Sequence, residues 1–246
     1  MNQSPQYVPG NRPHDPIGQA IFTDPERAAA FLRKRMPKEQ ADLFDWRTLQ
    51  PTTNSFVDDD LNKSTADLVF TVEPFDRSRN LELVVLQENK SSLSAAWPLQ
   101  LQLLKYFNAI VEPYRKALMK AIDEGKKELP KQILPVIVVF YHGKNPFNLK
   151  ALDEWFGLDG PFAWFGEQLP TVKFLLCDLN STTDEQLEED YIDRPDLLTG
   201  LLLMKHIWNP NLKNIINSVF KHAGKLLSST KGKHFFRLLT VYLGRG

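Results

Sequence analysis

Asp67, Glu88 and Lys90 are the residues whose types and spacing could perform chemistry together. Glu88 and Lys90 are two positions apart in an apolar run that predicts a strand, so their side chains emerge on one face. A hairpin partner strand carrying Asp67 would bring a second carboxylate beside Glu88. Two converging carboxylates suit Mg²⁺ or Mn²⁺, and a lysine beside them can hold or help to deprotonate water and offset phosphate charge. Hydrolysis of a phosphodiester is the chemistry that such a set serves.

The sequence around these residues predicts the hairpin that must position them. Residues 66–72 alternate apolar and other side chains, with Leu68 and Phe70 on one face. Residues 81–90 form a second strand-like run. The polar, turn-like residues 74–80 between them are short, so the two strands are expected to be antiparallel.

Helices and further strands around the hairpin predict an α/β sheet with helices packed on it. Helix-start residues predict a helix over 24–36. Apolar residues at three- and four-residue spacing predict a longer helix over 98–124, which Pro113 should kink or end early. An unbroken apolar run predicts a strand buried on both faces at 133–141, and another strand is expected at 172–178.

The chain divides into three parts. Residues 1–13 are rich in Pro, Asn and Gln and are expected to be a flexible arm. Residues 14–183 form the α/β core. Residues 184–246 are read as an acidic linker followed by a basic helical extension, with amphipathic helices over 201–208 and 212–227.

The zero net charge of the chain hides a basic end beside an acidic body. Residues 197–246 contain eight Lys and Arg side chains and no Asp or Glu. This tail is either a phosphate-facing lobe or a surface that docks on the chain's own acids or on another subunit.

The composition, 42% hydrophobic and 24% charged over 246 residues, is typical of globular domains. The longest apolar stretch is too short for a membrane helix, and the polar, Pro-rich N-terminus does not resemble an export signal. The single cysteine, Cys177, excludes an internal disulfide framework and a multi-cysteine zinc site. Cys177 lies in an apolar strand and is expected to be buried, and we expect a cytoplasmic protein.

Asp67 followed by Glu88-x-Lys90 resembles the active site of the PD-(D/E)XK nucleases, although Ala66 stands where their signature proline is common. The chain is also similar to the Rpn family of recombination-promoting nucleases, or YhgA-like transposases. The pieces that carry this similarity are His14-Asp15, Phe56 to Leu61 before Asp67-Leu68, Glu88 to Ser92, Leu103 to Tyr106, Leu134 to Ile137 before Tyr141-His142-Gly143, and Leu176 to Leu179. The residues after His14-Asp15 depart from the family pattern.

The resemblance implies a restriction-endonuclease-like core, a mixed sheet flanked by helices, with a C-terminal helical extension. It implies a divalent-metal-dependent DNA endonuclease linked to recombination or mobile elements. Asp67 and Glu88 would bind Mg²⁺, or Mn²⁺, and Lys90 would position or activate water. DNA is then the expected partner.

Four further residues are candidates for a nucleic-acid or supporting role. Gln102 and Tyr106 are four apart on a predicted helix and share a face, a spacing that resembles an accessory motif of RecB-like nucleases. Tyr106 also lies on the apolar stripe, so a plain core role is the alternative. His142 and Lys144 follow a buried strand and either contact phosphate or belong to a turn at Gly143.

Two other functions remain open. One is a nuclease fold that has lost catalysis and binds DNA or protein; the intact Asp67, Glu88 and Lys90 speak against it. The other is an assembly protein in which the apolar C-terminal helices form a homo-oligomer interface, a role that could coexist with catalysis.

Overall fold

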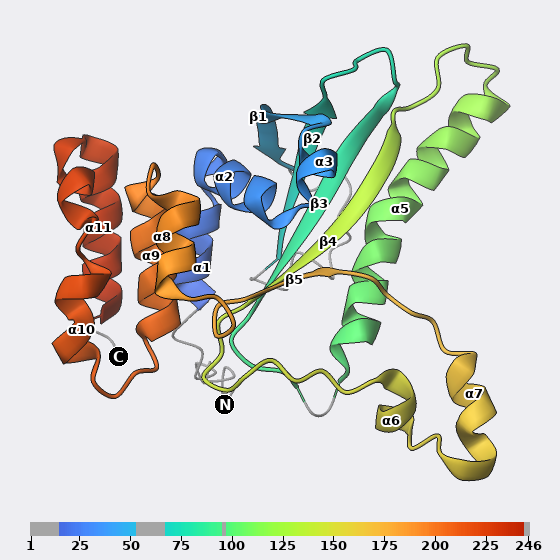
Figure 1. Ribbon diagram of the computed structural model, residues 1–246. Coiled ribbons are helices and arrows are strands. Elements are labelled where there is room, and N and C mark those ends of the chain that lie inside the picture. Colours follow the sequence, from blue (N-terminus) through green and yellow to red (C-terminus); the bar gives the residue numbers. More distant parts are fainter. Residues whose placement is uncertain (1–14, 53–66, 95–96, 244–246) are drawn as a thin grey trace, which may run out of the picture.

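The structure is a computed structural model that describes residues 15–52, 67–94 and 97–243 (Figure 1). Its elements in chain order are α1 (Asp15–Phe22), α2 (Pro25–Arg35), α3 (Lys38–Ala41), β1 (Phe44–Pro51), β2 (Asp67–Pro74), β3 (Leu81–Lys90), α5 (Leu99–Asp123), β4 (Gln132–Tyr141), α6 (Leu152–Phe156), the 3-10 helix η1 (Gly160–Phe162), α7 (Ala163–Glu167), β5 (Leu175–Asp178), α8 (Asp184–Tyr191), α9 (Pro195–His206), α10 (Leu212–Val219), the 3-10 helix η2 (Ala223–Ser228) and α11 (Thr230–Leu243).

The described strands form one mixed sheet in the order β1-β2-β3-β4-β5. β2 and β3 pair antiparallel, which confirms the predicted hairpin. β4 lies parallel to β3 over its whole length, and α5 is the crossover between them. β5 is also parallel to β4 and pairs only with the last four residues of β4. β5 is therefore shorter than the strand expected at 172–178.

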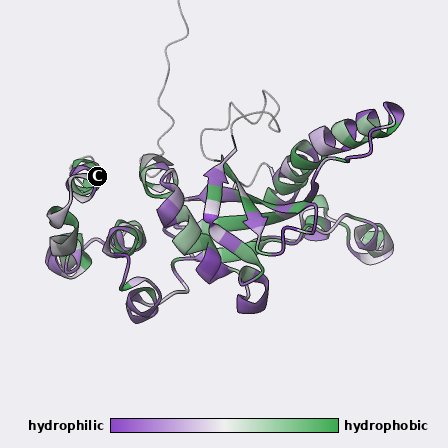
Figure 2. Cartoon of the chain, turned by 90° about the horizontal axis from the view of Figure 1, so that it is seen from above, coloured by the Kyte–Doolittle hydropathy of each residue, from purple (hydrophilic) through white to green (hydrophobic). Residues whose placement is uncertain are grey.

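The two faces of the sheet are covered by different helices (Figure 1). Phe70, Val85 and Phe140 point into a core shared with α1, α2 and the C-terminal helices. Val84 and Leu86 point to the other face, into a smaller core with α5. Seen from above, hydrophobic residues are concentrated along the strands between these layers (Figure 2). Alternation along each strand therefore decides which face a functional side chain occupies.

The larger core includes a group of aromatic rings at the centre of the sheet. The Phe140 ring meets Phe22 and Phe31 edge-on, with centroids 5.1 and 5.4 Å apart. Such edge contacts add about 0.5–1.5 kcal/mol each beyond the burial of their area. They fasten α1 and α2 to β4.

The helix predictions are largely confirmed. Asp24 caps α2 by accepting from the backbone of Glu26 and Arg27. α5 fills the predicted 98–124 range and continues through Pro113, so the expected early end is wrong. β1 was not predicted, and the first half of β4 is half-buried rather than buried on both faces.

The acid-rich residues after β5 are not a linker. They form α8, whose Thr183 and Gln186 make a capping box, and the first turn of α9. Leu187 and Tyr191 of α8 are buried in the larger core. α9 is buried from Leu197 to Met204, which corrects the prediction of an amphipathic helix there.

The basic tail docks in part on the chain's own acids. Lys231 lies 2.7 Å from Asp24, and Lys205 pairs with Asp184. The guanidinium of Arg27 also lies 4.3 Å from the centroid of the Phe235 ring, which ties α2 to α11. These contacts favour the docking interpretation of the tail for the lysines involved.

Within the described residues, no helix combines the length and apolarity that a membrane crossing requires.

Candidate active site

The sheet register places Asp67 directly opposite Glu88. Directly opposite residues of an antiparallel pair share a face, with Cβ atoms about 4.5–5.5 Å apart. Position 67 lies on the same face of β2 as Val69, which packs in the core with α5. Glu88 lies on the same face of β3 as Leu86, which belongs to that core too. The structure describes the backbone of Asp67 and not its side chain. The backbone alone puts the two acidic positions on the α5 face of the sheet.

Glu88 is a buried carboxylate, with 1% of its side chain exposed. Its Oε1 atom forms an ion pair with Lys90 and accepts a hydrogen bond from Gln102 Nε2 at 3.0 Å. Its Oε2 atom is buried and has no hydrogen-bond partner among the described residues. A buried charge is unfavourable unless it is compensated. One oxygen of Glu88, Oε2, is therefore available to bind a further positively charged ligand.

Lys90, Gln102 and Tyr106 form a connected network around Glu88. Lys90 donates from Nζ to Gln102 Oε1 over 3.0 Å, and Gln102 Nε2 donates to the Tyr106 hydroxyl. The Lys90 side chain is only 17% exposed. Gln102 therefore contacts the carboxylate, the ammonium group and the phenol at once, from the first turn of α5.

Tyr106 packs in the core, and its hydroxyl also contacts Gln102. Its ring is 4% exposed and packs with Leu103 and Ile110 in the α5 core. Its hydroxyl lies at the polar end of that core, against Gln102. The i, i+4 spacing on α5 produces this contact, as the sequence predicts.

The structure does not bring His142 into this network. Its ring is 2% exposed and stacks on Phe140 with centroids 5.6 Å apart. This ring lies on the face of the sheet that does not carry Glu88. Direct contact between this buried ring and a nucleic acid is therefore not supported. Its backbone supports the strand ends: its N–H donates to Lys90 O at 2.9 Å, and its carbonyl accepts from Trp208 at 2.8 Å. Lys144 is exposed in the loop that follows.

Gly143 is a residue whose importance the sequence did not reveal. A Cβ atom at this position would lie 2.2 Å from the Tyr141 hydroxyl and 2.5 Å from the Ser91 carbonyl oxygen. The loop after β4 therefore passes directly against the end of β3, one residue beyond Lys90. Asn180 holds the loop from the other side by donating to Gly143 O at 3.1 Å.

His14 and residues 56–61, which belong to the pieces that carry the family resemblance, lie outside the described residues. Burial raises the pKa of the Cys177 thiol to about 12, which keeps it protonated and unreactive, as expected. Among the described residues, no group of three or more His, Cys, Asp and Glu side chains could hold a metal ion.

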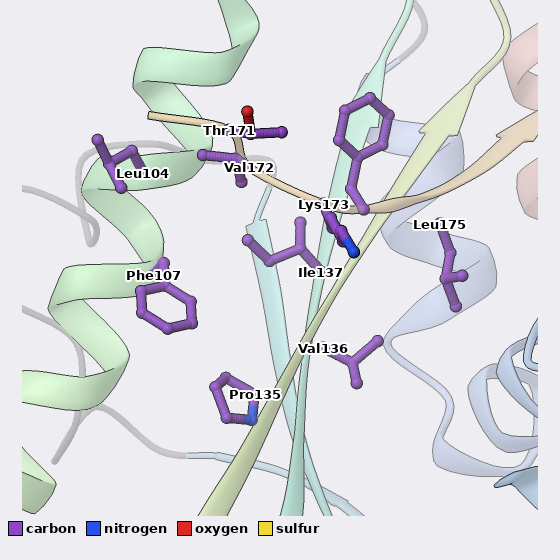
Figure 3. A pocket seen from close by; sticks show the side chains of 10 residues that line it. Leu104, Phe107, Pro135, Val136, Ile137, Thr171, Val172, Lys173 and Leu175 are labelled. Carbon is purple, nitrogen blue, oxygen red and sulfur yellow. The ribbon is translucent and has the colours of Figure 1, made fainter. Parts of the chain in front are cut away.

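A cavity of about 830 Å³ lies away from these residues (Figure 3). It is bounded by Leu104 and Phe107 of α5, Pro135 to Ile137 of β4 and residues 171–175. Glu88 and Lys90 instead align with Val139 and Tyr141, toward the other end of β4. The lining is mostly apolar, with Thr171 and Lys173 as its polar residues, and it includes neither Glu88 nor Lys90.

Comparisons with known proteins agree with the resemblance seen in the sequence. The family described as "Putative transposase, YhgA-like" matches residues 12–234. Among curated proteins, the chain is 27% identical over 210 residues to the inactive recombination-promoting nuclease-like protein RpnE of Escherichia coli K12, covering 84% of this chain and 62% of RpnE. It is 24% identical to the recombination-promoting nuclease RpnD of E. coli O157:H7 (84% and 72% covered) and 27% identical to the recombination-promoting nuclease RpnA of E. coli K12 (84% and 64% covered).

The chain thus spans less than two thirds of the length of RpnE and RpnA. No solved structure matches it significantly. The family match extends over most of the chain, including every residue of the Glu88 network. RpnA and RpnD carry the name of recombination-promoting nucleases, and RpnE carries that of an inactive nuclease-like protein. The chain belongs to the YhgA-like putative transposase family.

Proposed function

We propose that this chain is a divalent-metal-dependent DNA endonuclease of the PD-(D/E)XK type, linked to recombination. The observation that carries the proposal is the buried Glu88 carboxylate, which has one oxygen held by Lys90 and Gln102 and one without a partner among the described residues. The names of RpnA and RpnD support nuclease activity in the family.

The residues present fit a hard divalent cation. Mg²⁺ is usually held by one or two carboxylates and keeps several waters. Glu88 Oε2 and the acidic position opposite it, Asp67, would supply the two carboxylates. When bound, the cation would polarise the phosphate and lower the pKa of a bound water.

The side chains around Glu88 have separate roles in this proposal. Lys90 places an ammonium group beside the carboxylate, where it orients the attacking water and offsets the charge that develops on the phosphate. Gln102 fixes the positions of Glu88 and Lys90 relative to each other, and Tyr106 fixes Gln102. Gln102 and Tyr106 are thus positioning residues.

The test is cleavage of supercoiled plasmid by the purified chain with Mg²⁺, with Mn²⁺ and with excess EDTA. We expect nicking or linearisation that requires the metal and that is lost in Glu88→Gln and Asp67→Asn. Glu82→Gln is the matched control, because Glu82 lies on the same strand and face, six residues from Glu88. Metal-independent cleavage, or equal cleavage by all variants, would overturn the assignment.

The second candidate is a nuclease fold kept for binding, which the name of the inactive relative RpnE favours. In that case the wild-type chain would bind DNA in EDTA but leave plasmid intact at every Mg²⁺ concentration.

A further inference from the structure

A second cavity, of about 240 Å³, lies beside the carboxylate site at the start of α5. Leu93 and Ser94 after β3, Pro98 to Gln100, Asn148 to Lys150 and Trp155 of α6 form its walls. Leu93 follows Lys90 by three residues, and Gln100 lies in the same helical turn as Gln102. The cavity and the proposed cleavage site therefore both lie where the C-terminal end of β3 meets the N-terminal end of α5.

The volume and lining of the cavity suit one flat ring system. Its volume is below the roughly 300–1,000 Å³ of pockets that take drug-sized ligands. Leu93, Leu99 and Leu149 give it apolar walls, and the indole of Trp155 lines it while remaining 36% exposed. Figure 1 shows α6 near the start of α5, and Trp155 of α6 lines the cavity.

Gln100 lines the cavity and carries an amide oxygen that no described residue hydrogen-bonds. Its Nε2 donates to the Lys150 carbonyl over 2.6 Å, which orients the amide. Its Oε1 is buried and has no partner among the described residues. A buried acceptor without a hydrogen bond is unfavourable, so a ligand that brings an N–H group completes the site.

Lys150 supplies positive charge at the rim. Its ammonium lies 3.5 Å from Glu154, with 67% and 60% of the two side chains exposed. Exposed pairs of this kind are weak, so a phosphate group can compete for the lysine. An apolar slot, an N–H acceptor and a cation together match a nucleotide.

We propose that this cavity binds one unpaired nucleobase of the DNA strand cut at the neighbouring site. The ring lies against Trp155, an N–H of the base donates to Gln100 Oε1, and Lys150 contacts a phosphate of the same strand. A base paired in a duplex cannot enter such a cavity without leaving the stack. The substrate class is therefore DNA with single-stranded or locally unpaired nucleotides beside the cut, an inference that rests on the proposed function.

The test measures binding in EDTA, where cleavage cannot interfere. Fluorescence anisotropy compares a single strand, a blunt duplex and a duplex with a single-stranded flap, with folding checked by circular dichroism. The wild type should prefer the single strand and the flap. Trp155→Ala should weaken binding to these two by roughly 5- to 150-fold and leave duplex binding unchanged, whereas Trp155→Phe should retain most of the affinity.

Two further variants separate the cavity from the exposed aromatic surface around it. Gln100→Leu removes the acceptor and should weaken the same two complexes by about fivefold. Trp164→Ala is the matched control, since Trp164 of α7 is 61% exposed and does not line the cavity. It should bind all three DNAs as the wild type does.

The failures of the two proposals are distinguishable. Equal affinity of the wild type for the three DNAs, or equal weakening of all three by Trp155→Ala, would overturn the base subsite while metal-dependent plasmid cleavage still stood. A wild-type chain that neither binds nor cuts DNA would instead overturn the proposed function, and the subsite with it.

Discussion

Gln102 donates a hydrogen bond to Glu88 over 3.0 Å, across the gap between α5 and β3. The same side-chain amide accepts from Lys90 at 3.0 Å, so one uncharged group holds both members of the ion pair. A carboxylate and an ammonium group that share such a clamp cannot move independently. The site is therefore preorganised by a helix residue that bears no charge.

Gln102→Leu should impair catalysis without unfolding the chain. The substitution keeps the side-chain volume but removes both contacts to Glu88 and Lys90. Loss of an orienting partner at a metal site typically lowers metal affinity or activity by about 10- to 100-fold. Initial rates of plasmid cleavage in Mg²⁺ test this, with Asn108→Ala on the exposed side of α5 as control. A rate equal to the wild type's would show that Gln102 does not position the pair.

The contributions of the Tyr106 ring and the Tyr106 hydroxyl can be separated by mutation. Tyr106→Phe keeps the ring among Leu103 and Ile110 and should change the free energy of unfolding by about 1 kcal/mol. It should still reduce the cleavage rate, because Gln102 loses one anchor. Tyr106→Ala should destabilise by about 3–5 kcal/mol. Urea denaturation measures the change in the free energy of unfolding, and plasmid cleavage measures the change in rate. A Tyr106→Phe variant with full activity would show that Tyr106 is a core residue with no positioning role.

Gly143 should tolerate no side chain. A methyl group there would collide with the Tyr141 hydroxyl and the Ser91 carbonyl, so Gly143→Ala should lower the free energy of unfolding by about 1–3 kcal/mol. Gly224→Ala is the control, because no atom of the described residues lies within 4 Å of a Cβ atom there. Equal urea midpoints for the two variants would contradict the close approach of the loop to β3.

Stability should depend on pH through the contact between α2 and the C-terminal helices. Burial alone would raise the pKa of Asp24, but the hydrogen bond from Lys231 and the charge of Arg27 outweigh it and lower the pKa. A lowered pKa in the folded state means that ionised Asp24 stabilises the fold above about pH 4 and that this stabilisation is lost on further acidification.

Asp24→Asn isolates this contribution, because asparagine also caps a helix. The variant should be less stable than the wild type near neutral pH, and the difference should vanish as the pH falls below about 4. Urea unfolding at a series of pH values measures the difference. A stability difference that stays constant with pH would show that the charge of Asp24 does not stabilise the contact between α2 and the C-terminal helices.

The elements that carry the Glu88 network were predictable because local patterns match their environment. β3 and α5 follow simple alternation and three- and four-residue spacing, and the Asp67–Glu88 pairing follows from the short turn between β2 and β3. β1 was not predicted because its sequence contains the polar residues Asp45 and Arg47, which are not typical of a strand. In the structure Arg47 donates a hydrogen bond to Asp45 over 2.8 Å within the strand.

The remaining differences depend on tertiary contacts that no local pattern contains. α8 has a capping box that the sequence displays, but its acidic surface suggests a linker until Leu187 and Tyr191 are seen buried. His142 lies on the same face of the sheet as Phe140, on which its ring stacks, whereas Glu88 lies on the α5 face. Relating the two residues required the pairing of β3 with β4. The contact between Gln102 and Glu88 likewise required the packing of α5 on the sheet.

Binding of Mn²⁺, followed by the electron paramagnetic resonance signal of the free ion, tests the central claim most directly. The account predicts that the wild type and Glu82→Gln remove Mn²⁺ from solution alike, whereas Glu88→Gln and Asp67→Asn, both folded by circular dichroism, bind it at least tenfold more weakly. Equal Mn²⁺ binding by Glu88→Gln and the wild type would contradict the assignment of Glu88 Oε2 to a metal ion.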